Sequence, residues 1–512
     1  MLEKLYIGFV AFLDKIIWTI DVGPSVHKFF LSPHIGNFRV ALGKVRAVRL
    51  YRQAVKKVPA YKDFIDKHPG VQGPKIGLVK ATLNDVPEMD KNSYIKQYGL
   101  KEKIWHSELP TRGIMFDESS GSSGVPTSWV RGPKERRFTQ RIMQVAFRKY
   151  IGKTNPIIIN TFSMGAWATG LNTTLCLVGV SRIKSTGPDV VKVINTLKEL
   201  GDEIEYVISG YPPFLKQIAD SDEIDWKKYH VSAIYGGEGI SEPMRLALLK
   251  RFKSVIGSYG ASDLEINIAH ESEFTIALRQ ALIEDEKLRE ALLVQNRGIL
   301  PSVFQYNPYD YLIETNENGE LLITICRLEN LSPRIRYNIH DLGHVEHFYD
   351  LKKTLQRLGR KDLLKYAELD FGVLFHYGRS DLSVDYNGAV VGPEEVKQIL
   401  NAHDKYAQLV NNFRLIAYED KTAHKHLLFA VELQEAVQAN NKLEQEILSH
   451  IVDTLQITNL DFKSALSTSP LKPELRAYEI NTGIFDAAHQ KLKNDYVWNV
   501  DYRRAKQEGL IE

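Results

Sequence analysis

Short apolar runs alternate along residues 133–257 with segments in which apolar residues recur every three or four positions. The runs predict strands and the recurring positions predict helices. We expect strands at residues 156–160, 171–180, 205–209, 231–235 and 254–257. Helices are expected at 133–150, 189–200 and 241–252, and another follows Tyr211-Pro212-Pro213 and ends at Ala219. Strand–helix alternation at this spacing predicts a parallel sheet covered by helices on both faces.

The pattern differs on either side of this region. Residues 1–70 are predicted to be helical, and a charged helix is expected at 276–294, before strands at 312–313, 321–325 and 334–337. A new module with its own helices and strands begins near Tyr377. The sequence therefore predicts an α/β protein. A large N-terminal domain (1–377, with 1–70 as a helical lead-in) carries mixed or parallel sheets covered by helices, and residues 378–512 form a small mobile α+β C-terminal lid.

Length, charge and cysteine content narrow the class of protein. A chain of 512 residues is long enough for two or three domains. Its net charge of +3 does not favour nucleic-acid binding. The two cysteines, Cys176 and Cys326, lie in apolar runs that read as strands, so neither a disulfide framework nor a cysteine zinc site is expected. A reducing, cytoplasmic location is the default.

The N-terminus contains an apolar segment, residues 5–13, which Asp14 and Lys15 interrupt. It falls short of the roughly 20 apolar residues that a membrane-spanning helix needs, and a cleavable signal fits poorly. One alternative is a helix on a membrane surface, supported by seven cations downstream: Arg39, Lys44, Arg46, Arg49, Arg52, Lys56 and Lys57. Packing against its own domain is the more frequent outcome for such a segment.

A serine- and glycine-rich stretch, residues 119–127, lies between predicted strands at 113–117 and 127–130. Gly121 and Gly124 permit positive φ and close approach of the backbone to a ligand. Serine hydroxyls and free N–H groups form a concave set of donors suited to a polyanion such as a triphosphate. An ordinary surface loop is the alternative. A Walker loop is excluded, because no Gly-Lys-Ser/Thr ends the stretch and no helix follows directly.

Four later stretches carry candidate chemistry: residues 235–238, 258–263, 336–341, and 378–381 with Gly388. The first two follow predicted strands and are expected on one rim of the sheet, and the third places a carboxylate after a strand. Each alone fits a turn, a core tyrosine or a capping aspartate. Together and in this order, with residues 319–324 leading to 333–337, they resemble the adenylate-forming superfamily of acyl-CoA ligases and their relatives. The resemblance covers roughly residues 58–400 and is greatest to the phenylacetate–CoA ligase-like branch.

The resemblance implies a lid that rotates between two half-reactions, and it implies roles for particular residues. Gly237 and Glu238 would border the adenine, Tyr259 would stack on it, and Asp341 would accept hydrogen bonds from the ribose. Asp263 stands where the family usually has a glutamate that holds Mg²⁺, so its contact with the metal is expected to run through water. The remaining nucleotide-binding residues would be Ser119, Ser120, Gly121, Ser122, Ser123 and Gly124 at the β- and γ-phosphates, Gly260, Ala261 and Ser262 beside Tyr259, and Arg379 from the lid. Asp381 would be the hinge of the lid.

Residues 161–170 lie where the resemblance places the acyl pocket. Phe162, Met164, Gly165 and Trp167 are the candidate lining residues, and they suggest an apolar, aromatic or medium-length acid. The same composition would also suit core packing.

The chain departs from the family pattern in its cations. Val125 replaces a lysine that many relatives carry in the phosphate loop. The family usually has a lid lysine after a glycine, but Ile484 follows Gly483 here. Lys506 is the favoured alternative and Lys472 the second. His340, His344 and His347 have a spacing that could suggest a metal, although a surface or loop role is preferred.

The predicted function is ATP-dependent activation of a carboxylic acid as an acyl-adenylate, with release of pyrophosphate and transfer to a thiol such as CoA. ATP, Mg²⁺ and CoA are the expected small molecules. Transfer to an amine is an alternative, because residues 475–478 and 482–485 faintly resemble the tail of acyl-amido synthetases. A nucleotide-binding protein without catalysis and a membrane-surface interaction protein are the alternatives from other classes.

Overall fold

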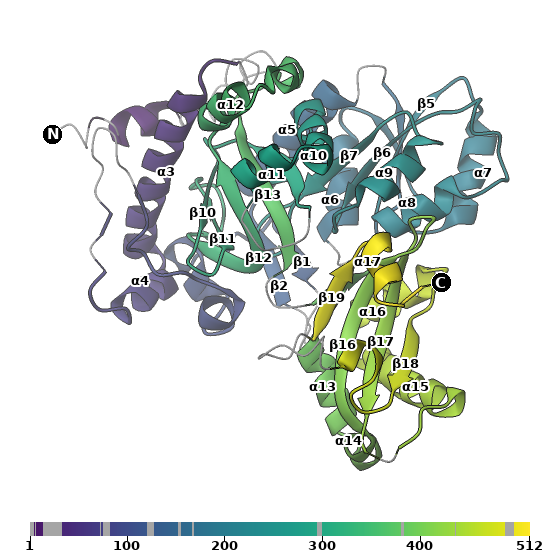
Figure 1. Ribbon diagram of the computed structural model, residues 1–512. Coiled ribbons are helices and arrows are strands. Elements are labelled where there is room, and N and C mark those ends of the chain that lie inside the picture. Colours follow the sequence, from purple (N-terminus) through teal and green to yellow (C-terminus); the bar gives the residue numbers. More distant parts are fainter. Residues whose placement is uncertain are drawn as a thin grey trace.

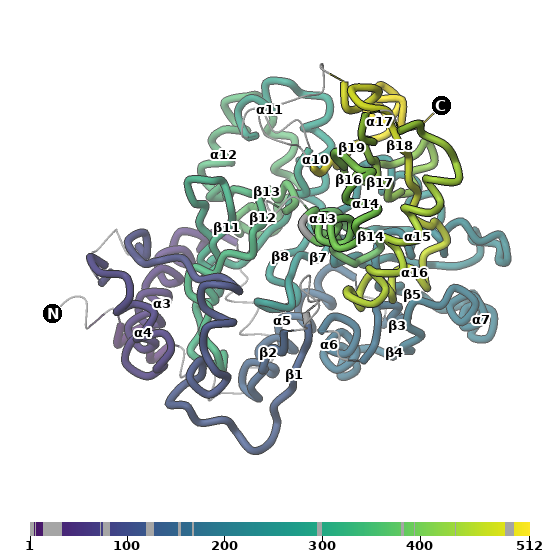
Figure 2. Tube along the Cα trace, turned by 90° about the horizontal axis from the view of Figure 1, so that it is seen from below, coloured from purple at the N-terminus to yellow at the C-terminus, as the bar shows by residue number. Residues whose placement is uncertain are grey.

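The computed structural model describes residues 5, 7–13, 33–71, 73–74, 82–119, 127–151, 155–165, 168–293, 300–379, 383–435, 437–486 and 496–511. A long and a short N-terminal helix lie beside one edge of a large sheet, and a smaller C-terminal domain lies below the sheet in this view (Figure 1). Figure 2 shows the same C-terminal domain from below, again next to strands of the large sheet. The predicted fold class is confirmed.

The N-terminal helices are α3 (Gly36–Lys57) and α4 (Pro59–Asp66). Val58 separates them in an extended conformation, as expected for a residue before proline, and Pro59 then begins α4. Buried ion pairs tie α3 to the rest of the domain: Arg39 to Asp370 at 2.5 Å and Arg46 to Asp310 at 3.1 Å. Two of the cations that suggested a membrane surface therefore face the protein interior.

No helix in the part of the chain that the structure describes is both long and apolar enough to cross a membrane.

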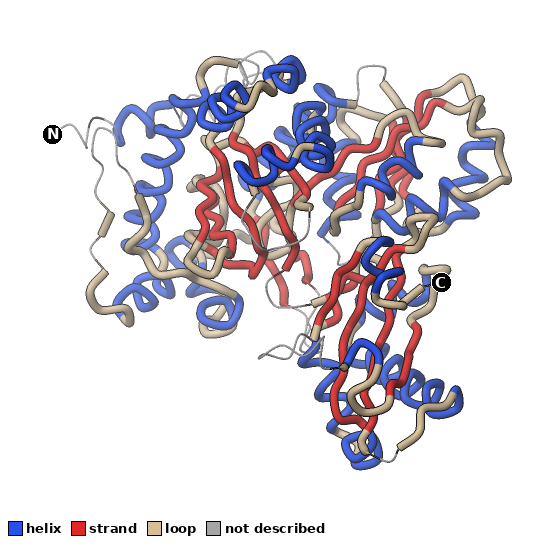
Figure 3. The backbone as a smooth tube through the Cα atoms, in the orientation of Figure 1, coloured by secondary structure: helices blue, strands red, loops and turns tan. Residues whose placement is uncertain are grey.

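The large sheet has eleven strands in the order β10-β11-β12-β13-β9-β8-β7-β6-β5-β3-β4. Strands β3 to β7 pair in parallel, and the strands from β7 through β8 to β10 pair antiparallel. Figure 3 shows the strands of this sheet with helices next to them. Their bounds are β3 Ile157–Asn160, β4 Arg182–Ser185, β5 Glu205–Gly210, β6 His230–Gly236, β7 Val255–Tyr259, β8 Ala269–His270, β9 Ser302–Tyr306, β10 Tyr311–Thr315, β11 Glu320–Ile325, β12 Tyr337–Glu346 and β13 Gly372–Arg379.

A separate hairpin, β1 (Met115–Ser119) with β2 (Thr127–Arg131), flanks the serine- and glycine-rich stretch. The N-terminal helices that follow are α5 Pro133–Tyr150, α6 Ala168–Leu177, α7 Val190–Leu200, α8 Pro212–Ala219, α9 Glu242–Leu249, α10 Glu273–Glu284, α11 Glu286–Leu292 and α12 Phe348–Arg357. Side chains such as Val193 of α7, Phe214 of α8 and Leu248 of α9 share one core with the parallel strands. Burial of this apolar surface holds the helices on the sheet.

The C-terminal domain has its own core and two small sheets. Strands β14 (Val384–Tyr386) and β15 (Ala389–Val391) form a hairpin, and the second sheet has the order β18-β17-β16-β19. The other bounds are β16 Val410–Glu419, β17 Lys425–Leu433, β18 Glu474–Tyr478, β19 Val497–Val500, α13 Pro393–Asn401, α14 Asp404–Leu409, α15 Asn441–Thr458, α16 Leu460–Thr468 and α17 Tyr502–Gln507.

Three expected elements differ from the structure. Of residues 171–180, expected as a strand, 171–177 belong to helix α6 and 178–180 form the turn after it. Thr173, Cys176 and Leu177 are buried at the three- and four-residue spacing of one helix face, and Cys176 is therefore helical. The charged helix is two helices, because Asp285 ends α10 and its side chain caps α11 by accepting from the backbone of Leu288. Asp341 lies within β12 and not after a strand.

Candidate active site

One cavity of about 1940 Å³ lies between the large sheet and the C-terminal domain. Residues at the carboxyl ends of the adjacent parallel strands β5, β6 and β7 line it, together with residues of β12, β13 and the C-terminal domain. Ligands of open α/β sheets bind at this edge. The volume exceeds the roughly 300–1,000 Å³ of a typical small-molecule site, so the cavity has room for more than one ligand.

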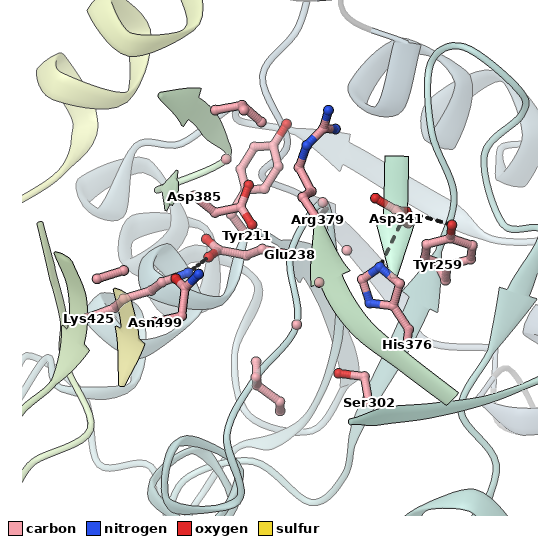
Figure 4. A pocket seen from close by; sticks show the side chains of 18 of the residues that line it. Tyr211, Glu238, Tyr259, Ser302, Asp341, His376, Arg379, Asp385, Lys425 and Asn499 are labelled. Atoms are coloured by element: carbon pink, nitrogen blue, oxygen red, sulfur yellow. Dashed lines mark hydrogen bonds and ion pairs between the residues drawn. The ribbon is translucent and has the colours of Figure 1, made fainter. Parts of the chain in front are cut away.

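Asp341 is a carboxylate of the cavity that two neighbouring side chains hold in place (Figure 4). The hydroxyl of Tyr259 donates to its Oδ2 at 2.7 Å, and Nε2 of His376 lies 3.3 Å from the same oxygen. Burial by itself raises the pKa of Asp341, but His376, Arg379 and the tyrosine hydroxyl outweigh it and hold the pKa below its usual value. Asp341 is therefore an anion at neutral pH and a strong hydrogen-bond acceptor.

Tyr259 contacts Asp341 through its hydroxyl, and its ring also borders the cavity. The ring centroid lies 5.0 Å from that of His376 and 5.8 Å from that of Phe304. Its hydroxyl contact was not foreseen. Stacking of the ring on adenine stays a prediction.

The loop after β7 carries Gly260, Ala261, Ser262 and Asp263, and all four line the cavity. A Cβ on Gly260 would lie 2.6 Å from the backbone nitrogen of Asn267, so only glycine fits this turn. Arg131 of β2 donates to the carbonyl oxygens of Leu264, at 2.6 Å, and of Ser262. The hairpin beside the serine- and glycine-rich stretch is thereby tied to the Asp263 loop.

Asp263 itself fits the role of a magnesium ligand. Its carboxylate borders the cavity, and the hydroxyl of Tyr337 donates to its Oδ2 at 2.8 Å. Mg²⁺ is commonly held by one or two protein carboxylates together with substrate phosphates and water. A single aspartate at this edge of the cavity is therefore compatible with Mg²⁺ that arrives with ATP.

The ring of Tyr211 lies between the two domains, against Gly237 of one and Gly388 of the other. A Cβ on Gly237 would lie 2.4 Å from its ring, and one on Gly388, in the β14–β15 hairpin, would lie 2.7 Å from it. Both glycines have positive φ, which also favours glycine. Pro212 follows Tyr211 directly and restricts the Tyr211 backbone to the extended region. The opposite neighbour of the ring is Phe162, edge-on at 5.2 Å.

The sequence-predicted acyl residues separate into two groups. Phe162 lines the cavity, as do the neighbouring Ser163, Ala168 and Thr169. Met164 and Gly165 are not among the lining residues, and Met164 is an exposed side chain. The structure therefore gives Met164 and Gly165 no place at the cavity wall.

The predicted cations also differ in position. Arg379, at the end of β13, lines the cavity, whereas Lys506 is exposed on α17 and is not part of the lining. Lys472 donates to the carbonyl oxygens of Leu466 and Ser469, at 2.5 Å and 3.0 Å, away from the cavity. Ser119 is the last residue of β1. The predicted site residues Ser120, Gly121, Ser122, Ser123, Gly124, Trp167 and Asp381 lie outside the described residues.

Tyr211, His376, Asp385 and Lys425 are among the lining residues that sequence reasoning missed. The Tyr-Pro-Pro sequence was a usable signal for Tyr211, because it fixes the direction of a large side chain directly after a strand. The other three carry no local signal: His376 reaches the cavity through pairing of β13 with β12, and Asp385 and Lys425 reach it where the C-terminal domain meets the large sheet. Burial raises the pKa of Asp385 and of Glu238, both of which lie close to Lys425.

The three histidines of residues 340–347 do not form a metal site. Among the described ranges, no group of three or more His, Cys, Asp or Glu side chains is placed to hold a metal. His344 contacts the carbonyl of Leu292 at 2.9 Å and stacks on Phe375, and His347 precedes helix α12. His340 instead lies 3.2 Å from a Glu320 oxygen and 3.7 Å from an Asp90 oxygen.

We expect His340 to make stability depend on pH. Hydrogen bonding to Asp90 raises its pKa from 6.5 to about 9, against burial and with further help from Glu320. The stabilisation is complete below pH 6.5 and is lost as the pH rises through about 9. His340→Asn, which tolerates the positive φ of this position, should lower Tm at pH 6 and flatten the fall of Tm between pH 6.5 and 9.5. His230→Asn, at an exposed position, is the control, and an unchanged pH profile in His340→Asn would contradict the assignment.

Comparison with known proteins defines the class of fold. No family model and no curated protein matches the sequence. Solved structures do match, and the architecture is that of the adenylate-forming ligases.

The particular structures are two of 2-hydroxyisobutyryl-CoA ligase. One of them contains the acyl-adenylate and CoA and is in the thioesterification state. Its sequence is 14% identical to this one, the match covers 94% of this chain and 93% of that chain, and the TM-score is 0.59. The other, in the postadenylation state with an acyl-adenylate, is 13% identical over 93% of each chain with a TM-score of 0.51. At these identities the likeness establishes the fold.

Proposed function

We propose that this chain is an ATP-dependent carboxylate ligase that forms an acyl-adenylate, releases pyrophosphate and transfers the acyl group to the thiol of CoA. The observation that carries the proposal is one large cavity on the ligand-binding edge of this fold, lined by the ionised Asp341, the Asp263 loop and Arg379. Its size suits a nucleotide together with an acid and an acceptor. Membership of the phenylacetate–CoA ligase-like branch is part of the proposal and rests on the sequence motifs alone.

In the first half-reaction a carboxylate oxygen of the acid attacks the α-phosphorus of ATP, and the bond from that phosphorus to the bridging oxygen of the β-phosphate breaks. Asp341 would hold the ribose hydroxyls, with Tyr259 and His376 fixing the direction of its carboxylate. Arg379 lies on the neighbouring strand, in register with Asp341, and would place its positive charge beside the nucleotide. Such positioning and charge neutralisation are the main needs of this chemistry. Mg²⁺ at Asp263 would screen the phosphate charge.

In the second half-reaction the thiolate sulfur attacks the acyl carbon, AMP leaves, and the thiol proton passes to solvent. The acid would lie near Phe162, and Tyr211 lies between Phe162 and the C-terminal hairpin. The higher TM-score against the thioesterification state of 2-hydroxyisobutyryl-CoA ligase, 0.59 against 0.51, supports acyl transfer as the step that this arrangement of the domains serves.

ATP–pyrophosphate exchange over a panel of carboxylic acids tests the proposal. At least one apolar or aromatic acid should give exchange that needs Mg²⁺, and added CoA should then give a thioester. Release of orthophosphate in place of pyrophosphate, or no exchange with any acid, would contradict it. Amide formation with an amine panel but no thioester with CoA would replace the thiol by an amine acceptor.

A further inference from the structure

A lysine of the C-terminal domain reaches into the cavity. Lys425 is the first residue of β17 and follows the turn that connects β17 to β16. This turn extends toward the N-terminal domain, and Lys425, Lys421 and Asp420 line the cavity there. Lys425 is therefore placed by the contact between the domains and not by the fold of its own domain alone.

The partner of Lys425 is Glu238, the candidate adenine-loop residue of the N-terminal domain. The Lys425 ammonium donates to Oε2 of Glu238, whose side chain is 1% exposed (Figure 4). Asp385, on β14 of the C-terminal domain, is the second acid beside this lysine. Burial disfavours the charge on Lys425, but both acids favour it and its pKa is raised. A buried charge is strongly destabilised when its partner is removed. Because Lys425 and Glu238 belong to different domains, each has its partner only while the two domains are in contact.

Other contacts of the same turn lie on either side of this pair. Nε2 of His424 lies 2.7 Å from Asp220 Oδ2, and the hydroxyl of Ser241 donates to Glu419. The His424 side chain is about one-third exposed. Its contact with Asp220 is therefore a surface ion pair, and such pairs contribute little to stability. The Lys425–Glu238 pair is the more buried contact and borders the ligand space.

The second carboxylate oxygen of Glu238 does not take part in the pair with Lys425. Its Oε1 is buried and has no hydrogen-bond partner among the residues that the structure describes. A buried carboxylate oxygen without a donor is costly, and this one borders the cavity. A ligand that donates a hydrogen bond would satisfy it, which makes Glu238 a group shared between the C-terminal domain and the ligand.

We propose that Lys425 is a positioning residue for acyl transfer: by pairing with Glu238 it holds the C-terminal domain in the arrangement that brings Gly388 against Tyr211. This inference rests on the proposed function. In the first half-reaction the resemblance implies a different lid arrangement, in which Lys425 would be separated from Glu238. Loss of the pair should therefore slow acyl transfer and spare adenylation.

The test separates the two half-reactions in the full-length protein. Lys425→Met and Glu238→Gln are compared with Lys425→Arg, which keeps the charge, and with Lys397→Met, at an exposed position on α13. Adenylation is followed by ATP–pyrophosphate exchange, with the acid that gives the most exchange in the panel. Acyl transfer is followed in single turnovers from preformed adenylate to CoA. We expect Lys425→Met to slow transfer at least roughly tenfold, because a buried pair is broken, and to change exchange by less than about threefold. Lys425→Arg should recover most of the transfer rate.

The double variant Lys425→Met/Glu238→Gln decides whether the two residues act as a pair. Its loss of transfer rate should be clearly smaller than the product of the two single losses, because the effects of substitutions at contacting residues are not additive. Multiplied losses in the double variant would overturn the pairing, and equal losses in both half-reactions would overturn the selective role. A transfer rate that Lys425→Met leaves unchanged would do the same.

A distance measurement tests the docking role without any activity. The two native cysteines, Cys176 and Cys326, are buried, so spin labels can be directed to cysteines introduced at the exposed Asp222 and Lys442. Lys425→Met should broaden the distance distribution between the domains, and Lys397→Met should not. An unchanged distribution would overturn the docking role. A broadened one in a protein without pyrophosphate exchange would uphold it while the proposed function fails.

Discussion

Replacing Asp341 by alanine is expected to weaken ATP binding by roughly 10- to 150-fold, or about 1.5–3 kcal/mol for hydrogen bonds to a charged acceptor. The physical reason is that the pKa of Asp341 is held low, so an ionised carboxylate faces the cavity at neutral pH. Titration calorimetry with ATP and Mg²⁺ measures the effect. Asp341→Asn keeps the shape and one acceptor and should lose less.

Controls are needed because Asp341 also accepts from Tyr259, which loses this acceptor in the alanine variant. The Tm of each variant should therefore be recorded, and Asp202→Ala, at an exposed position, serves as the control. Unchanged ATP affinity in a folded Asp341→Ala protein would remove Asp341 from the nucleotide site.

Replacing Lys506 by alanine is expected to slow adenylation by about 10²- to 10³-fold, the usual loss when a preorganised charge is removed. Lys506 is exposed and outside the cavity in this arrangement of the domains, so its action requires the lid rotation that the resemblance implies. Acyl transfer from preformed adenylate should be unaffected. Stopped-flow detection of pyrophosphate measures the first step.

Lys472→Ala is the matched control, because this lysine is occupied by the carbonyl oxygens of Leu466 and Ser469. A loss of less than about tenfold in adenylation for Lys506→Ala, about 1.4 kcal/mol in the barrier, would exclude Lys506 as the lid cation.

The fold was largely predictable because local pattern and tertiary structure agree in most of the chain. The runs at 205–209 and 231–235 form the parallel strands β5 and β6; β5 is buried at nearly every position, and β6 alternates between buried and half-buried positions. Residues 171–180 misled the prediction, since an apolar run of this length can be a strand or a buried helix. The burial of α6 at helical spacing resolves that ambiguity only in the structure.

The site was predictable only where a motif carries it. Asp341, Tyr259 and Asp263 stand in recognisable stretches, and the structure places all three at the cavity. Contacts between distant strands have no such mark: His376 meets Asp341 through the pairing of β12 with β13, and Lys425 meets Glu238 across 187 positions. Asp381 and most of the serine- and glycine-rich stretch lie outside the described residues, so their roles stay predictions.

The ring of Tyr211, which leaves no space for a side chain at Gly237 or at Gly388, has a consequence for sequence variation. The three positions are coupled, since substitutions at groups that share a contact are not additive. A smaller residue at 211 would relieve the steric restriction on both glycines at once, although their positive φ would continue to favour glycine. Attempts to change the acid specificity through position 211 would therefore alter the mutational tolerance of a hairpin in the other domain, a form of epistasis between two parts of the chain that share no strand.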